Sequence, residues 1–308
     1  MIRGSWSLHT NLNQKLYNLV SENYGFVLIA VQCLVDGVNS VFEIDAKDSR
    51  YFFKIFDRDR DIQDIQWELD AVLNFPNGSS CRVARPIKSL GGADFVKVDF
   101  GAFASLFEEA RGRPIAVDRT DLFQFGTSLA TLQNSLNEMP LGPPDARYFD
   151  SVALLRDTIE LLESKLGVSK HLLQSLTALR SIFSKLSQLP SSWCHGDARF
   201  ENCHIENGVL TFFDFENLFY GPRIYDLAKG KWCLEQIDPP NAPGLWESLL
   251  NGYRSVYTLS KLEDESIEQL VCLNEVWSLH FLAAKCELSP ELWEYTDLRA
   301  QRIFSGLV

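Results

Sequence analysis

The pattern of apolar and polar residues changes about a third of the way along the chain. In the first part, leucines and a valine recur at helical spacing over residues 10–24, which predicts a short amphipathic helix. Apolar runs bounded by turn residues then predict three antiparallel strands, over 26–34, 41–45 and 51–56. The chain therefore begins with a predicted sheet.

Helical spacing returns once before the sheet is complete. Apolar residues at Ile62, Ile65, Leu69 and Val72 predict a helix over 62–73. After it, further runs predict strands over 83–89, 95–100 and 102–107. Gly112 and Pro114 then mark the end of the β-rich part.

Helical periodicity dominates the rest of the chain. The predicted helices cover 120–137, 150–166, 169–187, 243–258, 263–287 and 290–304. Gly126, in the middle of the first of them, indicates close packing against a neighbour. These patterns predict an α+β protein with a β-rich first part and a larger, mostly α-helical second part.

Composition fits a folded protein with large cores. The 308 residues are 46% hydrophobic, with seven Trp and 21 Phe, which excludes disorder, and the length allows two domains. Seven scattered cysteines without a Cys-x-x-Cys pair favour reduced thiols in a cytosolic protein. The N-terminus lacks an apolar signal core, and the strongest apolar run, 26–35, is too short to cross a bilayer. We expect a cytoplasmic protein without a membrane partner.

Charge is unevenly distributed along the chain. Residues 1–100 carry 11 Lys and Arg against 13 Asp and Glu, whereas residues 101–308 carry 18 against 28. An acidic second part argues against a nucleic-acid partner. It would suit a cationic small molecule, although acidic surfaces also simply keep proteins soluble, and this second interpretation is favoured.

One lysine interrupts an apolar strand. Lys54 lies within Tyr51-Phe-Phe-Lys-Ile-Phe56, where its charge requires either solvent at an edge or a buried anionic partner. On the helix predicted over 62–73, Glu68 falls beside Val72 at the margin of the apolar stripe. Taken alone, these two residues are better explained as surface charges, and a pair between Lys54 and Glu68 is favoured only together with the motif over residues 195–216.

Oxygen-bearing side chains gather in the segment His195-Gly-Asp-Ala-Arg-Phe-Glu-Asn202 and in Phe212-Phe-Asp-Phe-Glu216. Asp197 precedes Asn202 by five residues, and a predicted hairpin with an Asn-Gly turn connects Asn202 to Asp214. A loop aspartate can accept a proton from an attacking hydroxyl, while an amide oxygen and a carboxylate can hold Mg²⁺. This pattern suits phosphoryl transfer.

These segments, with Gly221-Pro222 and Asp226-Leu-Ala228 after them, resemble the aminoglycoside phosphotransferase and choline kinase superfamily. Their spacing is most similar to the branch that holds type II homoserine kinases and the bacterial stress-response kinase A. The resemblance implies a bilobal protein-kinase-like fold. The lobes would be residues 1–107, which bind the nucleotide, and 113–308, which hold the catalytic loop and the substrate, with a hinge over 108–112.

The resemblance also implies roles for individual residues. Lys54, fixed by Glu68, would contact the phosphates of ATP, and the hinge backbone at Glu108, Glu109 and Ala110 would receive the adenine ring. The loop over 34–40 would be a phosphate lid, although it has one glycine and equally reads as an ordinary hairpin turn.

In the second lobe, the resemblance makes Asp197 the base and Asn202 and Asp214 the ligands of Mg²⁺. Arg199, two residues after Asp197, is a candidate transition-state clamp. His195 is expected to be structural, with a histidine base as the alternative. Asp226 would brace the catalytic loop.

We therefore expect an ATP- and Mg²⁺-dependent phosphotransferase that acts on a hydroxyl of a small molecule, with an amine-bearing one favoured. Candidate acceptors by family analogy are homoserine-like amino alcohols, choline-like alcohols and aminoglycosides. A protein serine/threonine kinase is the first alternative, and a nucleotide-binding pseudokinase scaffold is the second. The sequence identifies neither the acceptor nor the oligomeric state.

Overall fold

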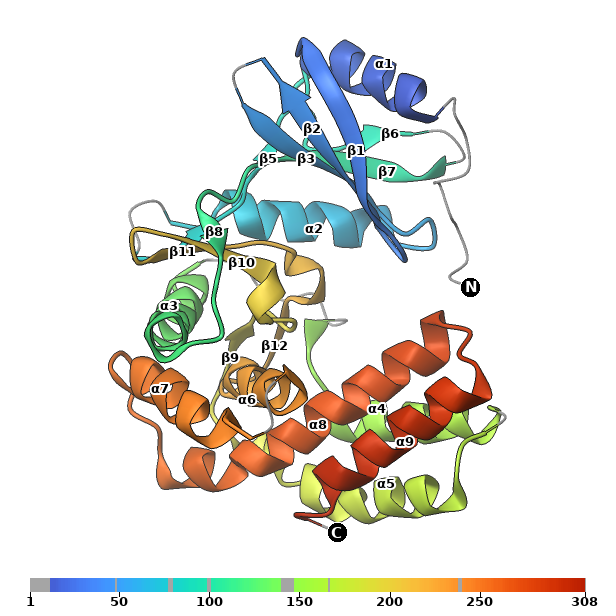
Figure 1. Cartoon of the computed structure of the whole chain (residues 1–308), viewed down its shortest axis with the longest axis vertical. Helices are drawn as coiled ribbons and strands as arrows, with labels where there is room; N and C mark the ends of the chain where they lie inside the picture. Colours follow the sequence, from blue (N-terminus) through green and yellow to red (C-terminus); the bar gives the residue numbers. More distant parts are fainter. Residues whose placement is uncertain are drawn as a thin grey trace. The chain divides into compact units, whose positions relative to one another are not determined.

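The computed structural model describes residues 12–47, 49–76, 80–98, 101–139, 147–165, 167–237 and 240–307 (Figure 1). The chain divides into two compact units. The first, called the sheet unit here, comprises Ile2–Phe75 and Val83–Arg111, and the second, the helical unit, comprises Pro76–Arg82 and Gly112–Val308. The predicted lobe and hinge boundaries stay a prediction.

The sheet unit contains a six-stranded antiparallel sheet with the order β1-β2-β3-β7-β5, to which β6 adds by pairing with β7. The strands are β1 (Leu28–Asp36), β2 (Ser40–Ala46), β3 (Arg50–Ile55), β5 (Pro86–Ile87), β6 (Val96–Lys97) and β7 (Phe103–Glu108). Two helices, α1 (Leu12–Tyr24) and α2 (Ile62–Leu73), complete the unit. The three initial strands and both helices agree with the sequence pattern.

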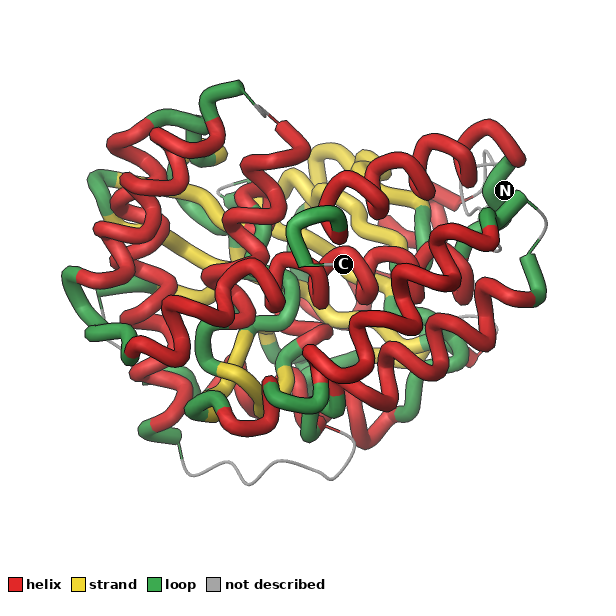
Figure 2. The backbone as a smooth tube through the Cα atoms, turned by 90° about the horizontal axis from the view of Figure 1, so that it is seen from below, coloured by secondary structure: helices red, strands yellow, loops and turns green. Residues whose placement is uncertain are grey.

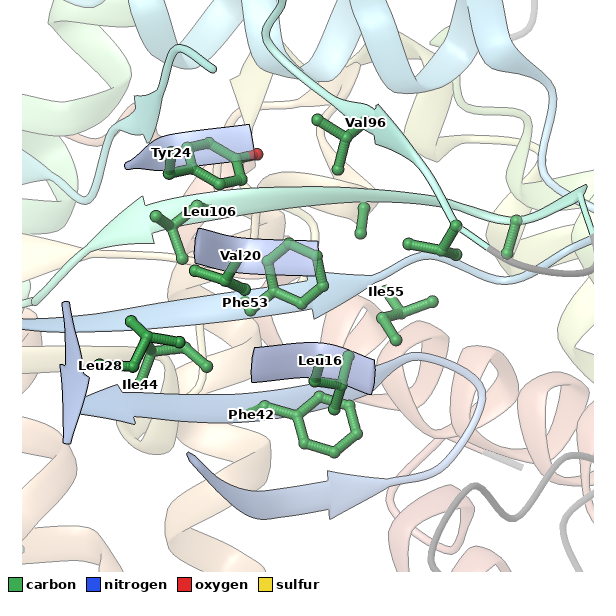
Figure 3. Packing of buried hydrophobic residues seen from close by; sticks show 13 residues of the cluster. Leu16, Val20, Tyr24, Leu28, Phe42, Ile44, Phe53, Ile55, Val96 and Leu106 are labelled. Carbon is green, nitrogen blue, oxygen red and sulfur yellow. The ribbon is translucent and has the colours of Figure 1, made fainter. Parts of the chain in front are cut away.

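The two faces of this sheet pack against different helices because side chains alternate along a strand. Phe53 of β3 joins the cluster that includes Leu16, Val20 and Tyr24 of α1 (Figure 3). Phe56, just after β3, instead packs with Ile65 and Leu69 of α2. By this alternation Lys54 lies on the same side as Phe56, and its side chain is directed toward α2.

The strand predicted over 83–89 is wrong in its extent. The structure has two short strands there, β4 (Arg82–Val83) and β5, and they belong to different sheets. Pro86 begins the second of them, and proline is tolerated at the start of a strand because it has no N–H to donate. A continuous apolar run alone does not reveal such a break.

Helices make up most of the helical unit (Figure 2). They are α3 (Arg119–Asn137), α4 (Ser151–Glu163), α5 (Lys170–Phe183), α6 (Tyr225–Ile237), α7 (Ala242–Arg254), α8 (Lys261–Lys285) and α9 (Pro290–Phe304). Each of the six predicted helices in this part of the chain is present, with ends shifted by a few residues. No helix of the described residues is both long and apolar enough to cross a membrane.

Helices α3 and α7 approach closely through a glycine on each. A Cβ atom on Gly126 would overlap the carbonyl oxygen of Leu249, and one on Gly252 would overlap that of Phe123. The close packing expected at Gly126 is therefore confirmed. Helix α3 also contacts strands on both sides of the His195–Asn202 segment in the sequence.

Short strands in the helical unit position the loops. One sheet has the order β4-β11-β10-β8, and β12 pairs with β9 in another. The remaining strands are β8 (Arg113–Pro114), β9 (Ser191–Cys194), β10 (Cys203–Glu206), β11 (Val209–Phe212) and β12 (Phe219–Pro222). The predicted Asn-Gly hairpin is confirmed, since β10 and β11 pair in register around Asn207 and Gly208, both with positive φ.

Candidate active site

In the sheet unit, Lys54 and Glu68 form the pair that the sequence predicts. Both residues are buried, and Lys54 Nζ lies 3.9 Å from Glu68 Oε1. The apolar stripe of α2 carries Glu68 against the sheet, while the alternation along β3 brings Lys54 to the same side. The pair can hold an ammonium group at a fixed position, and its role at the phosphates stays a prediction.

A third charged residue in this cluster was not predicted. Arg60, just before α2, places Nη1 2.5 Å from Glu68 Oε2 and Nε 2.7 Å from Asp64 Oδ2. Its guanidinium lies 5.5 Å from the ring centroid of Phe56, and its side chain is only 8% exposed. The spacing of four residues between Arg60, Asp64 and Glu68 was the available signal.

Of the predicted hinge residues, Glu108 is the last residue of β7, and Glu109 and Ala110 follow the strand. The Glu108 N–H donates to the carbonyl oxygen of Arg85 over 2.9 Å, and the Arg85 N–H donates back to Glu108 Oε1 over 3.1 Å. Glu109 lies 3.7 Å from Arg50, and Ala110 is buried. Both carboxylates have partners on the protein, so adenine recognition here would rest on the backbone, as expected from the resemblance.

In the helical unit, the loop after β9 is braced by a buried carboxylate. Asp226 accepts hydrogen bonds from the His195 N–H at 2.7 Å and the Gly196 N–H at 2.9 Å. Gly196 has a φ of 82°, and a Cβ there would overlap the carbonyl oxygen of Asn217. Burial raises the pKa of Asp226, and the hydrogen bonds from the backbone donors oppose that rise.

The contacts of His195 are compatible with the structural role expected for it. It is fully buried, and its ring lies 4.5 Å from that of Phe215. Nδ1 accepts the Asp197 N–H at 3.3 Å, so Nε2 carries the proton and donates to the Phe213 carbonyl oxygen at 3.0 Å. With both ring nitrogens bonded to the backbone, neither is available as a base.

Both oxygens of the Asp197 carboxylate have a partner in the helical unit. Asn202 Nδ2 donates to Asp197 Oδ2 over 3.0 Å and to the Asp197 carbonyl oxygen over 2.9 Å. Lys229 Nζ lies 3.4 Å from Oδ1, and Arg199 Nε lies 3.7 Å from Oδ2. The Asp197 side chain is nevertheless 15% exposed, so a bound hydroxyl could reach it.

Arg199 and Lys229 approach Asp197 in different environments. The Arg199 side chain is 43% exposed and also lies 3.8 Å from Glu201. Lys229, on the first turns of α6, is buried. Sequence reasoning identified Arg199 from the kinase-like loop but missed Lys229, whose signal was its place three residues after Asp226.

Asn202 and Asp214 have the donor atoms that a hard cation prefers. The amide nitrogen of Asn202 donates to Asp197, so the amide oxygen of Asn202 is the side-chain atom that can coordinate a cation. The Phe213 N–H donates to the Asn202 carbonyl oxygen over 3.1 Å, so the backbone before Asp214 lies against Asn202. Asp214 itself has a left-handed backbone, with φ 65° and ψ 63°. An amide and a carboxylate oxygen fit Mg²⁺.

Residues 33–262 match the phosphotransferase enzyme family. The chain belongs to this family. The match covers most of both units, including the sheet with Lys54 and the loop with Asp197. The predicted family, enzyme class and α+β kinase-like fold are therefore confirmed.

Individual proteins and solved structures are also similar to the chain. Hydroxylysine kinase of Mus musculus is 24% identical over 255 residues, which is 74% of this chain and 66% of that relative's length. A solved structure of an amicoumacin kinase in complex with AMP-PNP, Ca²⁺ and Ami has a TM-score of 0.76 at 20% identity, covering 96% and 93% of the two chains. A microcompartment-associated aminopropanol kinase has a TM-score of 0.66 at 17% identity, covering 95% and 96%. These structures share the fold.

Proposed function

We propose that the protein transfers the γ-phosphoryl group of ATP, in a Mg²⁺-dependent reaction, to a hydroxyl of a small amine-bearing molecule. The observation that carries this proposal is the Asp197 carboxylate in a chain of the phosphotransferase enzyme family. It is held at both oxygens on a braced loop and stays partly exposed. Such a carboxylate can orient an acceptor hydroxyl.

Positioning matters more than strong basicity in this chemistry, because the transition state of phosphoryl transfer is loose. The acceptor oxygen would bond to the γ-phosphorus as the bond to the β–γ bridging oxygen breaks, with ADP leaving. Asp197 would hold the hydroxyl and take its proton late in the reaction. Asn202 and Asp214 would hold Mg²⁺, which neutralises charge on the phosphate oxygens when bound.

Lys54 would contact the α- and β-phosphates, with Glu68 holding its ammonium in place. The exposed guanidinium of Arg199 would lie near the transferred group as a candidate clamp. The backbone at Glu108, Glu109 and Ala110 would receive the adenine ring. These roles follow from the family resemblance, and the contacts around each side chain are compatible with them.

The choice of acceptor rests on the relatives. Proteins similar to this chain are named as kinases of hydroxylysine, amicoumacin and aminopropanol. Hydroxylysine and aminopropanol each contain an amine and a hydroxyl group. The acidic balance of residues 101–308 is compatible with a cationic acceptor. We therefore rank hydroxylated amines and amino acids above neutral alcohols.

The test is ADP release with Mg²⁺ and a panel of hydroxylysine, 1-amino-2-propanol, homoserine, choline and an aminoglycoside, with ³¹P NMR of the product. Asp197→Asn should remove the turnover. The matched control is Glu201→Gln, an acid on the same loop that is 61% exposed and should leave turnover within about twofold.

Three results would redirect the proposal. Phosphorylation of added proteins, with none of the small molecules, would favour the serine/threonine kinase interpretation. ATP binding without any turnover would favour the scaffold interpretation. Turnover that Asp197→Asn leaves unchanged would show that another group receives the proton.

A further inference from the structure

Lys229 is a buried cation within the candidate active site of the helical unit. It is 1% exposed, and Nζ lies 3.4 Å from Asp197 Oδ1. The same nitrogen lies 5.0 Å from the ring centroid of Trp232 and 4.8 Å from that of Trp277. Trp232 follows on the same helix, α6, and Trp277 lies on α8, so two helices contribute to the surroundings of the ammonium group.

The two tryptophans are themselves held in place. Trp232 Nε1 donates to Glu275 Oε2 over 2.8 Å, and Glu275 is fully buried on α8. Arg299 of α9 donates to the other oxygen of Glu275 over 2.8 Å. Trp277 stacks on Phe281 with ring centroids 5.7 Å apart. The two rings beside Lys229 are therefore held by contacts with side chains of α8, and Arg299 of α9 in turn holds Glu275.

Packing alone does not account for a lysine at this position. Removing an ammonium group from water is costly, and an apolar side chain of similar length would fill the same space without that penalty. Two aromatic faces and one carboxylate offset part of the penalty. Since Asp197 is the one carboxylate within 4 Å of Lys229 among the ion pairs of the described residues, the charge of Lys229 acts on Asp197.

The contacts at Asp197 indicate what that action is. Asn202 holds Oδ2 and Lys229 holds Oδ1, so the plane of the carboxylate is fixed from two sides. Lys229 approaches from the buried side, with 2% of its side chain exposed against 15% for Asp197. The exposed part of the carboxylate is thereby left for the acceptor hydroxyl.

We propose that Lys229, held between Trp232 and Trp277, is a positioning residue that fixes the Asp197 carboxylate for phosphoryl transfer. The inference rests on the proposed function. It adds to the reaction a residue that lies outside the His195–Asn202 loop and touches neither phosphate nor acceptor. A displacement of about 1 Å in a reacting group can lower a rate on the order of 10²-fold, so loss of this contact should be visible in kcat.

The kinetic test compares Lys229→Met with Lys231→Met. Lys231 is the matched control, because it lies two residues later on the same helix and pairs with Glu235 and Glu268. We expect Lys229→Met to lower kcat on the order of 10²-fold with the KM for ATP changed less than about threefold. Lys229→Arg should recover part of the loss, and Lys231→Met should stay within about twofold of wild type. A Lys229→Met protein with wild-type kcat would overturn the inference.

A second test does not depend on activity. Asp197→Asn leaves the buried ammonium without its carboxylate, so the Tm should fall, and adding Lys229→Met to that variant should restore part of the Tm. Additive Tm shifts of the two single variants would overturn the inference whatever the activity. Coupled shifts in a protein that phosphorylates no acceptor would instead overturn the proposed function and leave the pair in place.

Discussion

The two units each contain a carboxylate that faces a lysine and an arginine, but the carboxylate and the arginine differ in burial between the two units. In the sheet unit the carboxylate of Glu68 is buried, at 2% exposed, and both cations are buried beside it. In the helical unit Asp197 is partly exposed, Lys229 is buried and Arg199 is 43% exposed. The same chemical groups thus form two different sites.

The difference in burial fits the two roles proposed for these carboxylates, since Glu68 would hold a lysine in place and Asp197 would act on the acceptor hydroxyl. A carboxylate enclosed by two cations and a helix can fix the position of a lysine but cannot reach a substrate. A carboxylate that contacts a buried lysine on one side and solvent on the other can pair with that lysine and also reach a substrate. This comparison predicts that variants of the first cluster change stability and nucleotide affinity, whereas variants of the second change kcat.

The largest expected effect is the difference in kcat between Asp197→Asn and Glu68→Gln. Asp197→Asn should lower kcat about 10²–10⁴-fold, because an amide cannot take the proton of the hydroxyl. Glu68→Gln should mainly raise the KM for ATP and lower the Tm. Steady-state kinetics and thermal unfolding of both variants would measure this, and an identical pattern in the two would contradict the comparison.

Asp226→Asn should have the next largest effect. An amide at this position can accept only one of the two backbone N–H bonds from His195 and Gly196, so the loop loses its brace. We expect a loss of about 3 kcal/mol in unfolding free energy, measured with urea, and a lower kcat. The matched control is Asp61→Ala, which removes a helix N-cap in the sheet unit and should cost about 1 kcal/mol. Equal losses of unfolding free energy in Asp226→Asn and Asp61→Ala would show that the two hydrogen bonds of Asp226 stabilise the protein no more than a helix N-cap does.

Arg60→Met should be more destabilising than a surface variant but leave chemistry intact. It removes the cation nearest to Glu68, and Lys54 lies farther from that buried carboxylate. We expect a loss of about 2 kcal/mol in unfolding free energy. The variant should keep its kcat at saturating ATP, and a loss of kcat comparable to that of Asp197→Asn would show that the two clusters act as one.

The smallest expected effect is that of Arg199→Met. Its guanidinium is exposed and lies 3.7 Å from Asp197, so its contribution to stability should be below about 1 kcal/mol and should shrink further at high salt. The contribution of Arg199 to catalysis would be measured as the change in kcat of Arg199→Met. A fall in kcat on the order of 10²-fold would support the clamp assignment, and a change below about threefold would contradict it.

Sequence patterns were sufficient to predict the elements that depend on residues close together in the chain. The Asn207-Gly208 hairpin and the helices with clear periodicity lie where they were predicted, because turn chemistry and amphipathic spacing act over a few residues. The pairing of Lys54 with Glu68 was predicted from the periodicities of a strand and a helix together with the family resemblance of the later segments. The family resemblance then supplied their candidate roles.

By itself, then, the sequence determined the order of the elements, the family and the groups proposed to act on phosphate. Tertiary structure decided which further charges surround those groups. Lys229 looks like any polar position of a helix until α6 and α8 place two tryptophans over its ammonium, and Arg60 resembles a loop charge until Phe56 and Glu68 enclose it. These two residues could not be recognised from the sequence because the burial of a charge depends on side chains from distant segments. A local sequence pattern does not reveal those side chains.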